Sequence, residues 1–258
     1  MIITTSARTN SLYIQMAKQI ASDLGVNYHE RGRDSIQDLQ EALKEEVLVV
    51  GKNRLELYIP SVDQSIFFHP NSAMFRMKRL LSGNHDPFVE ACQLSQGMSI
   101  LDCTLGLGSD SIVASYSVGS GGRVTSLEGS KTLAYLVQTG LKTWDTQIPV
   151  MNDSMRAIQI VSTPYQDYLK KCQDKSMDVI YFDPMFEDSI EGSVGLQGVK
   201  KLAIYDDLTE ESIEEAKRVA TGRIVLKDHW RSNRFERLGF TPIHRKSANF
   251  HYGVIELG

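Results

Sequence analysis

Short apolar runs and amphipathic segments alternate along the second half of the chain. The runs are typical of buried strands, and the segments between them carry apolar residues three or four positions apart, as helices do. The predicted strands cover residues 98–102, 123–128, 157–161, 177–182 and 224–227, and the predicted helices cover 88–94, 111–118, 130–141, 164–171 and 209–220. This alternation predicts a parallel sheet with helices on both faces.

The two ends of the chain follow other patterns. Near the C-terminus, residues 242–244 and 250–257 predict a closing antiparallel pair, which brings the sheet to seven strands. Near the N-terminus, the predicted elements are a strand at 2–3, helices at 12–24 and 36–43, and a hairpin with strands at 47–50 and 55–59. The fold class is therefore α/β, with a Rossmann-like sheet of seven strands and a small N-terminal α/β domain.

These patterns divide the chain into three parts. We expect a small N-terminal α/β domain over residues 1–60, a linker or basic loop over 61–86, and the larger domain over 87–258. The middle part interleaves basic and apolar residues, so an amphipathic helix with its basic residues in solvent is the alternative to a loop.

Composition restricts the function classes. The 258 residues carry a net charge of -4, which excludes a protein that coats nucleic acid by charge alone, so any RNA contact must be a local patch. Three cysteines without a C-x-x-C pair suggest neither a disulfide framework nor a zinc site, and we expect no metal. No run approaches the ~20 apolar residues that span a bilayer, and the first residues lack a signal-peptide pattern. We expect a cytoplasmic protein without membrane contact.

A tight turn with two glycines follows the strand at 98–102. The stretch S-I-L-D-C-T-L-G-L-G-S-D ends the strand in Asp102 and places Gly106 and Gly108 before a helix. Glycine permits positive φ and lets a ligand approach the backbone closely. The free N–H groups of the helix then point at whatever lies over the turn. This stretch predicts a site for a nucleotide-like cofactor.

The details of the turn narrow the class of cofactor. No Lys follows the glycines as a P-loop requires, and Ser111 stands where a dinucleotide fingerprint has its third Gly. Asp102 suits a cofactor with ammonium and sulfonium cations, and Glu128, at the end of the next strand, can accept both ribose hydroxyls. We therefore predict S-adenosylmethionine. The alternative is a plain turn with helix-capping acids.

A second candidate site follows the strand at 177–182, where the chain reads Asp183-Pro184-Met185-Phe186. The Asp183 carboxylate and the Pro184 carbonyl can both accept hydrogen bonds from an exocyclic amine, and Phe186 can stack on a base. Acceptors on both N–H groups let the nitrogen attack a methyl group and stabilise charge that appears only during transfer. A strand-end Asp-Pro is otherwise a common turn.

Four segments together resemble the RsmJ family, the small-subunit ribosomal RNA guanine-N2 methyltransferases. They read D-C-T-L-G-L-G-S-D-S, V-I-Y-F-D-P-M-F, I-V-L-K and F-H-Y-G-V, and the resemblance covers roughly residue 67 to the C-terminus. It implies a class I methyltransferase that uses S-adenosylmethionine and acts on the exocyclic amine of a guanine, with ribosomal RNA or the small ribosomal subunit as partner.

The resemblance also implies roles for individual residues. Asp102, Gly106 and Gly108 would hold the methionine end of the cofactor, Glu128 the ribose and Ser162 the adenine side. We expect the remaining cofactor contacts at Thr104, Ser109, Asp110, Gly129 and Asp183, and the catalytic residues are Asp183, Pro184 and Phe186.

Two groups of basic residues are candidate RNA contacts. They are Arg76, Lys78 and Arg79 in the middle part, and Lys227, Arg231 and Arg234 near the C-terminus. The latter stretch has Trp230 or Phe235 available for stacking on bases. Solvated helix faces are the alternative for both groups.

Several features differ from the family pattern. Ser109 stands where the family usually has a basic residue, and Lys227 precedes Asp228 instead of Arg-Pro. Residues 1–60 do not obviously match. A methyltransferase for a small molecule or a protein, and a non-catalytic RNA-binding protein of the same fold, remain open, as does the oligomeric state.

Overall fold

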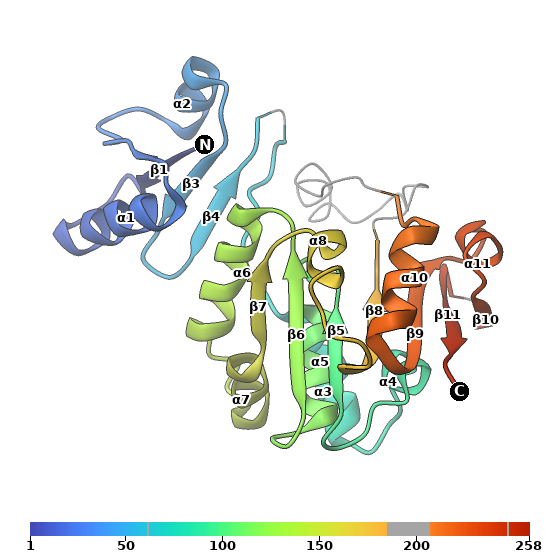
Figure 1. The fold of residues 1–258 in the computed structure, drawn as a ribbon. Coiled ribbons are helices and arrows are strands. Elements are labelled where there is room, and N and C mark those ends of the chain that lie inside the picture. Colours follow the sequence, from blue (N-terminus) through green and yellow to red (C-terminus); the bar gives the residue numbers. More distant parts are fainter. Residues whose placement is uncertain (61, 185–206, 247) are drawn as a thin grey trace.

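The computed structural model describes residues 1–60, 62–184, 207–246 and 248–258 and contains two sheets (Figure 1). The N-terminal sheet has the strand order β2-β1-β3-β4, and the main sheet has the order β10-β11-β9-β8-β5-β6-β7. The strands of the N-terminal sheet are β1 (Ile2–Thr5), β2 (Asn27–Tyr28), β3 (Val47–Val50) and β4 (Leu55–Tyr58). Those of the main sheet are β5 (Ser99–Asp102), β6 (Arg123–Glu128), β7 (Gln159–Ser162), β8 (Met177–Phe182), β9 (Ala220–His229), β10 (Thr241–Ile243) and β11 (Phe250–Glu256).

The main sheet reverses its direction of winding at β5. From β5 the chain goes to β6 and β7 on one side, then returns to β8 and β9 on the other, and all of these strands are parallel. β11 pairs antiparallel with β9, and β10 pairs antiparallel with β11. The predicted α/β fold with seven strands is confirmed. Ligands of such sheets bind beyond the carboxyl ends of the strands at the reversal point, here β5 and β8.

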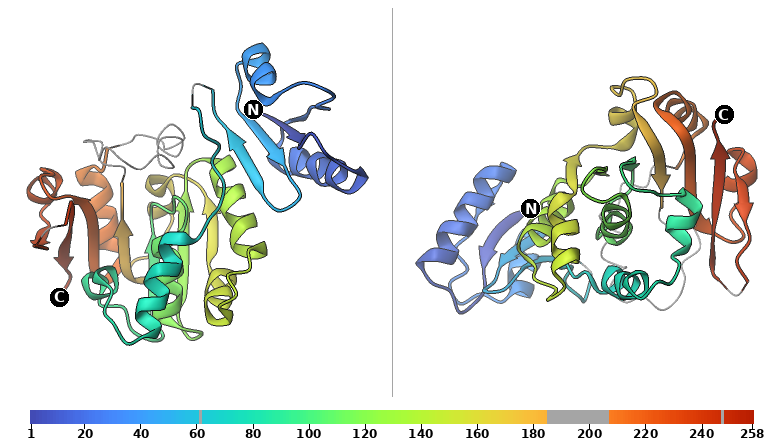
Figure 2. Two further views of the ribbon diagram at one scale, coloured as in Figure 1. Left: turned by 180° about the vertical axis from the view of Figure 1, so that it is seen from behind. Right: turned by 90° about the horizontal axis from the view of Figure 1, so that it is seen from below.

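Helices cover both faces of the main sheet (Figure 2). One face carries α4 (Pro87–Cys92), α5 (Ser109–Val118), α6 (Lys131–Thr143) and α7 (Pro149–Ala157), and the other carries α8 (Tyr165–Leu169), α10 (Glu210–Val219) and α11 (Arg234–Arg237). The remaining helices are α1 (Ser11–Leu24), α2 (Ile36–Leu43) and α3 (Asn71–Leu81).

Helices α3, α7 and α11 and strand β2 add to the predicted elements. The middle part contains α3, which matches the alternative of an amphipathic helix because Ala73 and Met77 are buried four residues apart. The sequence did not predict α7, which begins at Pro149 and packs against α5 through a hydrogen bond from the Ser115 hydroxyl to the Ser154 carbonyl (2.8 Å). Strand β9 also runs past the predicted end at Lys227, because His229 still pairs with β11.

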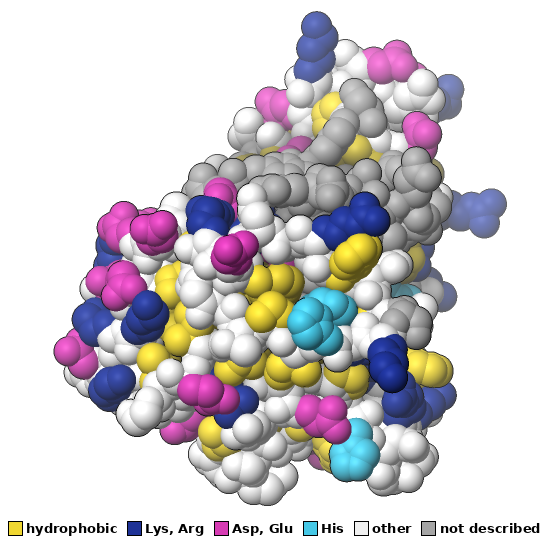
Figure 3. Space-filling model, turned by 90° about the vertical axis from the view of Figure 1, so that its right-hand side faces the viewer, with side chains coloured by type: hydrophobic (Ala, Val, Ile, Leu, Met, Phe, Trp, Pro, Cys, Tyr) yellow, Lys and Arg dark blue, Asp and Glu magenta, His cyan; other side chains and the backbone are white. Residues whose placement is uncertain are grey.

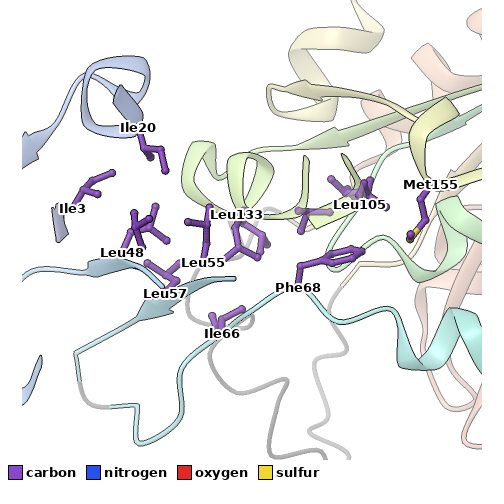
Figure 4. Close-up of a cluster of buried hydrophobic side chains, with 14 of the residues drawn as sticks. Ile3, Ile20, Leu48, Leu55, Leu57, Ile66, Phe68, Leu105, Leu133 and Met155 are labelled. Carbon is purple, nitrogen blue, oxygen red and sulfur yellow. The ribbon is translucent and has the colours of Figure 1, made fainter. Parts of the chain in front are cut away.

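The N-terminal sheet shares its core with the main domain (Figure 4). One hydrophobic cluster contains Ile3, Leu48 and Leu57 from that sheet together with Leu133 and other apolar residues of α6. Helix α1 packs on the same face, and α2 covers the opposite face. Because α6 completes this core, the two sheets depend on each other for burial of apolar surface.

We expect the Gly140→Ala variant to lose stability. Gly140 lies on α6 against Phe68, and a Cβ added there would be 2.1 Å from the ring Cγ. A forced fit of this kind costs about 1–3 kcal/mol, more than the roughly 1 kcal/mol that Ala gains in helix propensity. Urea unfolding followed by circular dichroism measures the difference.

Gly121→Ala is the control, since its Cβ would meet no atom closer than 3.8 Å. The fluorescence of Trp144, which contacts Phe68, should report the same single transition as circular dichroism. Unchanged stability, or two separate transitions, would contradict a shared core.

Candidate active site

The predicted site residues form one row along the carboxyl edge of the main sheet. In the order of the strands from β9 to β7 they are Lys227, Asp183, Asp102, Glu128 and Ser162. Strands lie about 4.8 Å apart, so the cofactor residues from β5 to β7 span about 10 Å, and Asp183 and Lys227 lie on the other side of β5. The order of the strands separates Asp102, Glu128 and Ser162, which we call the cofactor half after their predicted role, from Asp183 and Lys227, which we call the acceptor half.

Asp102 is buried beneath the turn that follows β5. Its Oδ1 accepts hydrogen bonds from the Thr104 backbone N–H (3.0 Å) and hydroxyl (3.4 Å), and its Oδ2 accepts one from the Ser111 hydroxyl. Burial raises the pKa of Asp102 to about 7, although the bonds from Ser111 and Thr104 oppose this shift. A cation over the turn would favour the ionised carboxylate, which fits a cofactor with positive charge.

The two glycines of the turn differ in exposure, since Gly106 is half-buried and Gly108 is buried. Gly106 and Gly108 have φ of 51° and 80°, in the left-handed region. A Cβ on Gly106 would meet no atom closer than 3.9 Å, so the backbone conformation, and not a lack of space, requires Gly there. Gly108 caps α5, whose first residue Ser109 is half-buried.

Glu128 faces the same turn from the end of β6. Its Oε1 accepts a hydrogen bond from the Ser130 N–H (2.9 Å). Burial raises its pKa, while the backbone N–H groups of Ser130, Gly106 and Gly129 oppose this shift. Ser162 is exposed and lies opposite Glu128 in the pairing of β6 with β7. These placements bring together the predicted cofactor residues from three strands.

Thr104 connects the cofactor half to the acceptor half. Its hydroxyl accepts a hydrogen bond from the Asp183 backbone N–H (2.7 Å) and donates to Asp102. The Asp183 side chain keeps 25% of its surface exposed, and burial of the carboxyl group raises its pKa to about 6, although Lys227 opposes the shift. Pro184 is half-buried beside it, and the predicted catalytic Phe186 lies outside the described residues.

The acceptor half continues into a chain of alternating charges, which we call the ion chain: Asp183, Lys227, Asp110, Arg76 and Asp86. The Lys227 Nζ lies 2.6 Å from Asp183 Oδ2 and 3.3 Å from Asp110 Oδ2. Arg76, from α3, donates to Asp110 Oδ1 and to both oxygens of Asp86 (2.8 Å each). Asp86 in turn caps α4. The chain thus runs from the strand edge to the helix layer.

The charges of the chain stabilise one another. Burial opposes ionisation of Asp110, but Lys227 and Arg76 outweigh it and hold the pKa of that carboxyl well below its usual range. Burial likewise disfavours the Lys227 ammonium, yet Asp110 and Asp183 raise its pKa. The Tyr181 hydroxyl adds a hydrogen bond to Asp110 Oδ2 (2.9 Å). Both oxygens of Asp110 are therefore occupied by protein donors, which leaves it little capacity for a cofactor.

The structure separates the predicted RNA contacts into two groups. Arg76, Lys227 and Arg234 are bound to carboxylates inside the protein. Lys78, Arg79 and Arg231 are exposed. Of the two candidate stacking residues, Phe235 is buried, whereas Trp230 is 46% exposed and carries the Arg231 guanidinium 4.4 Å from its ring. Acidic and basic side chains are interspersed on the face toward β10 and β11 (Figure 3).

The sequence did not reveal the inward roles of Lys227 and Arg76, nor Asp86 and Tyr181 as members of this site. Lys227 and Asp110 are 117 positions apart, and Arg76 and Asp110 are 34 apart. The one local signal is Asp86-Pro87, which is typical of a helix start.

The part of the chain that the structure describes contains neither a metal site nor a membrane-spanning helix. No group of three or more His, Cys, Asp or Glu side chains there could hold a metal ion. Within the same residues, no helix has the length and apolar character needed to cross a membrane.

Comparison with known sequences identifies relatives of this chain. A family model described as "Putative SAM-dependent methyltransferase" matches residues 35–246. The chain is 45% identical over 255 residues to "Uncharacterized protein YpiP" of Bacillus subtilis (strain 168), and this alignment covers 99% of each chain. It is 31% identical over 170 residues to "Ribosomal RNA small subunit methyltransferase J" of Acinetobacter baumannii (strain SDF), and this alignment covers 59% of this chain and 58% of that protein.

Comparison with solved structures concerns the fold. The SAM-dependent methyltransferase NGO1261 from Neisseria gonorrhoeae aligns with a TM-score of 0.64 over 99% of this chain and 96% of its own. The sequences are 15% identical, so this similarity shows the fold alone. It confirms the predicted class I methyltransferase fold.

We expect Asp102→Asn to stabilise the protein at alkaline pH. The pKa of this carboxyl is about 7 in the folded state and about 3.9 in an unfolded chain. The protonated Asp102 carboxyl contributes fully to the free energy of unfolding below a pH of about 3.9, and this contribution is lost as the pH rises through 7. A neutral amide avoids this loss, so the variant should gain about 1–4 kcal/mol at pH 8 and less at pH 5.5.

Urea unfolding at both pH values measures this effect. Asp153→Asn, an exposed position on α7, is the matched control and should give the same small difference at both pH values. A gain in stability that does not depend on pH would show that burial of the Asp102 charge is not its cause.

Proposed function

The chain belongs to the family of SAM-dependent methyltransferases, and we propose that it methylates the exocyclic amine of a guanine in small-subunit ribosomal RNA. When bound, S-adenosylmethionine supplies an electrophilic methyl group. The support for an amine acceptor is the position of Asp183, and the support for ribosomal RNA is the partial similarity to ribosomal RNA small subunit methyltransferase J. Such an enzyme would work in the cytoplasm, with the small subunit as its partner.

The residues of the cofactor half suit the charges of this cofactor. Asp102 would complement the cationic methionine end through the turn, and the backbone of Gly106 and Gly108 would allow close approach. Glu128, which faces Gly106, would accept the ribose hydroxyls, and Ser162 lies farther along the edge for the adenine side. The remaining predicted contacts, Thr104, Ser109 and Gly129, come from the same two loops.

The residues of the acceptor half suit an amine. Among the described residues, only Oδ2 of the Asp183 carboxylate has a hydrogen-bond partner, so Oδ1 can accept an N–H. The Pro184 carbonyl would accept the second N–H, since Pro has no N–H of its own to compete. These acceptors strengthen their bonds as the nitrogen gains positive charge, which stabilises the transition state more than the bound substrate. Asp183 can take the proton once the methyl group has transferred.

A second acceptor class has support from one observation. Three of the six predicted RNA contacts are bound to carboxylates inside the protein, which reduces the basic surface available for a phosphate backbone. A methyltransferase for an amine of another kind of molecule is therefore the alternative, and methyl transfer assays with different acceptors distinguish the two.

We expect S-adenosylmethionine binding to depend on the ionisation of Asp102. Below the pKa of about 7, the affinity should fall about tenfold per pH unit, because the cofactor's cation favours the carboxylate. Binding at pH 7 should release about half a proton per site, which calorimetry in buffers of different ionisation enthalpy measures. NAD is the control ligand. Binding of NAD without S-adenosylmethionine, or affinity constant from pH 6 to 8, would contradict this role.

We expect Asp183→Asn to reduce methyl transfer about 100-fold or more and to leave cofactor affinity within about threefold. Its amide cannot accept a proton and presents one acceptor oxygen instead of two. The assay incubates the variant and the wild type with labelled cofactor and small subunits from cells that lack the protein, and then maps the label on the RNA.

Asp174→Asn, at an exposed carboxylate bound to Arg218, is the matched control and should transfer at the normal rate. Collapse of cofactor affinity in Asp183→Asn would show that Asp183 serves the cofactor and not the acceptor. Label on another molecule, with none on the RNA, would favour the alternative acceptor class.

A further inference from the structure

Lys227 is an unusual residue at this position of the site. Its side chain is 18% exposed, its ammonium bridges two carboxylates, and it lies over the Phe250 ring at 5.2 Å. The charge of Lys227 is stabilised by Asp110 and Asp183 and is retained at neutral pH. It therefore cannot serve as a base for the amine, and a phosphate group would have to compete with both carboxylates for it.

We propose that Lys227 is the positioning residue of the acceptor half: anchored by Asp110 and Arg76, it holds Asp183 as an anion with Oδ1 directed to the amine. This inference rests on the proposed function, because it concerns how Asp183 receives its substrate. It assigns to Lys227 and Arg76 an inward role in place of the RNA contact expected from the sequence.

The geometry of the ion chain supports this role. A 2.6 Å contact binds Lys227 to one oxygen of Asp183 only. The backbone N–H of Asp183 donates to the Thr104 hydroxyl, so the backbone and the side chain of Asp183 are both restrained. With Oδ2 occupied, the described residues leave Oδ1 as the acceptor, and the carboxylate has one orientation in which to present it.

The anchor of Lys227 comes from elements outside its own strand. Asp110 on α5 is itself held by Arg76 of α3 and by the Tyr181 hydroxyl of β8. Arg76 binds Asp86 with two hydrogen bonds, which ties the chain to the start of α4. Because each inner charge has an opposite charge on both sides, the desolvation of the buried ions is compensated along the whole chain.

The charges around Asp183 predict opposite effects for two substitutions. Lys227 lowers the pKa of Asp183, whereas Asp110 and Asp228 raise it. Asp102, Tyr181 and Tyr252 also face this carboxyl, and Arg76 lies beyond Asp110. Removal of the ammonium should therefore raise the pKa of Asp183, and removal of the Asp110 charge should lower it because Lys227 then pairs with Asp183 alone.

The test is a titration of the carboxyl carbons by NMR, with ¹³C-labelled aspartate and the Asp183 signal identified by its loss in Asp183→Asn. In the wild type we expect a pKa of about 6. In Lys227→Met it should rise by about one unit or more, and in Asp110→Asn it should fall. Lys227→Arg, which retains the charge, should stay near the wild type.

The same variants are assayed for methyl transfer from pH 5 to 9 with the small-subunit substrate. The acid limb of kcat should follow the Asp183 pKa of each variant, so Lys227→Met should lose about tenfold or more at pH 5 and recover toward pH 9. Its affinity for S-adenosylmethionine should change less than about threefold. A structural role alone would lower the rate equally at every pH.

Lys217→Met is the matched control, since Lys217 forms a 2.7 Å pair with Glu214 on the exposed side of α10. It should change neither the titration nor the rate profile. If Lys227→Met does not fold, the fall of the Asp183 pKa expected in Asp110→Asn carries the same test. An Asp183 pKa that stays constant in the folded variants, or a rate loss without a shift of the acid limb, would overturn the proposal.

The titration needs no methyl acceptor, so the two proposals can fail separately. A wild type that binds S-adenosylmethionine but methylates no amine would refute the proposed function, whatever the titration shows. Normal methyl transfer by the wild type, together with an Asp183 pKa that does not change in Lys227→Met, would refute the positioning role alone.

Discussion

The burial of carboxylates at the reversal point of the main sheet is the constraint on which this structure depends. Asp102, Asp110 and Asp183 lie within one small region, where desolvation favours their neutral forms. The protein compensates them differently. Asp110 has cations on two sides, Asp183 has one cation, and Asp102 has only neutral donors. These differences set three distinct affinities for a proton from one residue type.

The number of cations that compensate each buried carboxylate follows the order of the strands. Neutral donors do not compensate the charge of a buried carboxylate, so a nearby cation would stabilise it. Asp102 is such a carboxylate, and it lies at the end of β5, where a cationic cofactor would contact it. A carboxylate with one cation and one open oxygen can accept an N–H, and Asp183 lies next to it at β8. Thr104 joins the two through one hydroxyl, so a change in the conformation of one turn would reach the other. The two halves of the site are mechanically linked.

The supports of the site extend beyond the main sheet. Arg76 comes from α3, which the sequence pattern left between a loop and a helix, and α3 follows directly on the N-terminal sheet. That sheet packs on α6, whose capping residue Ser130 also binds Glu128. The N-terminal part thus contributes to the stability of the elements that carry both halves of the site.

The sequence by itself determined the elements and the chemistry of single positions. Apolar periodicity predicted the strands of both sheets except β2, because burial imposes a local pattern of side chains and the two residues of β2 are not buried. The glycine turn, Glu128 and Asp183-Pro184 indicated the cofactor and acceptor sites, because strand ends and left-handed residues leave local signals. Only the tertiary structure decided how the charges combine. Lys227 and Arg76 resemble exposed basic residues in the sequence, and their partners lie as much as 117 positions away. Electrostatic energy depends on distance in space and on burial, and neither quantity is encoded in the local pattern.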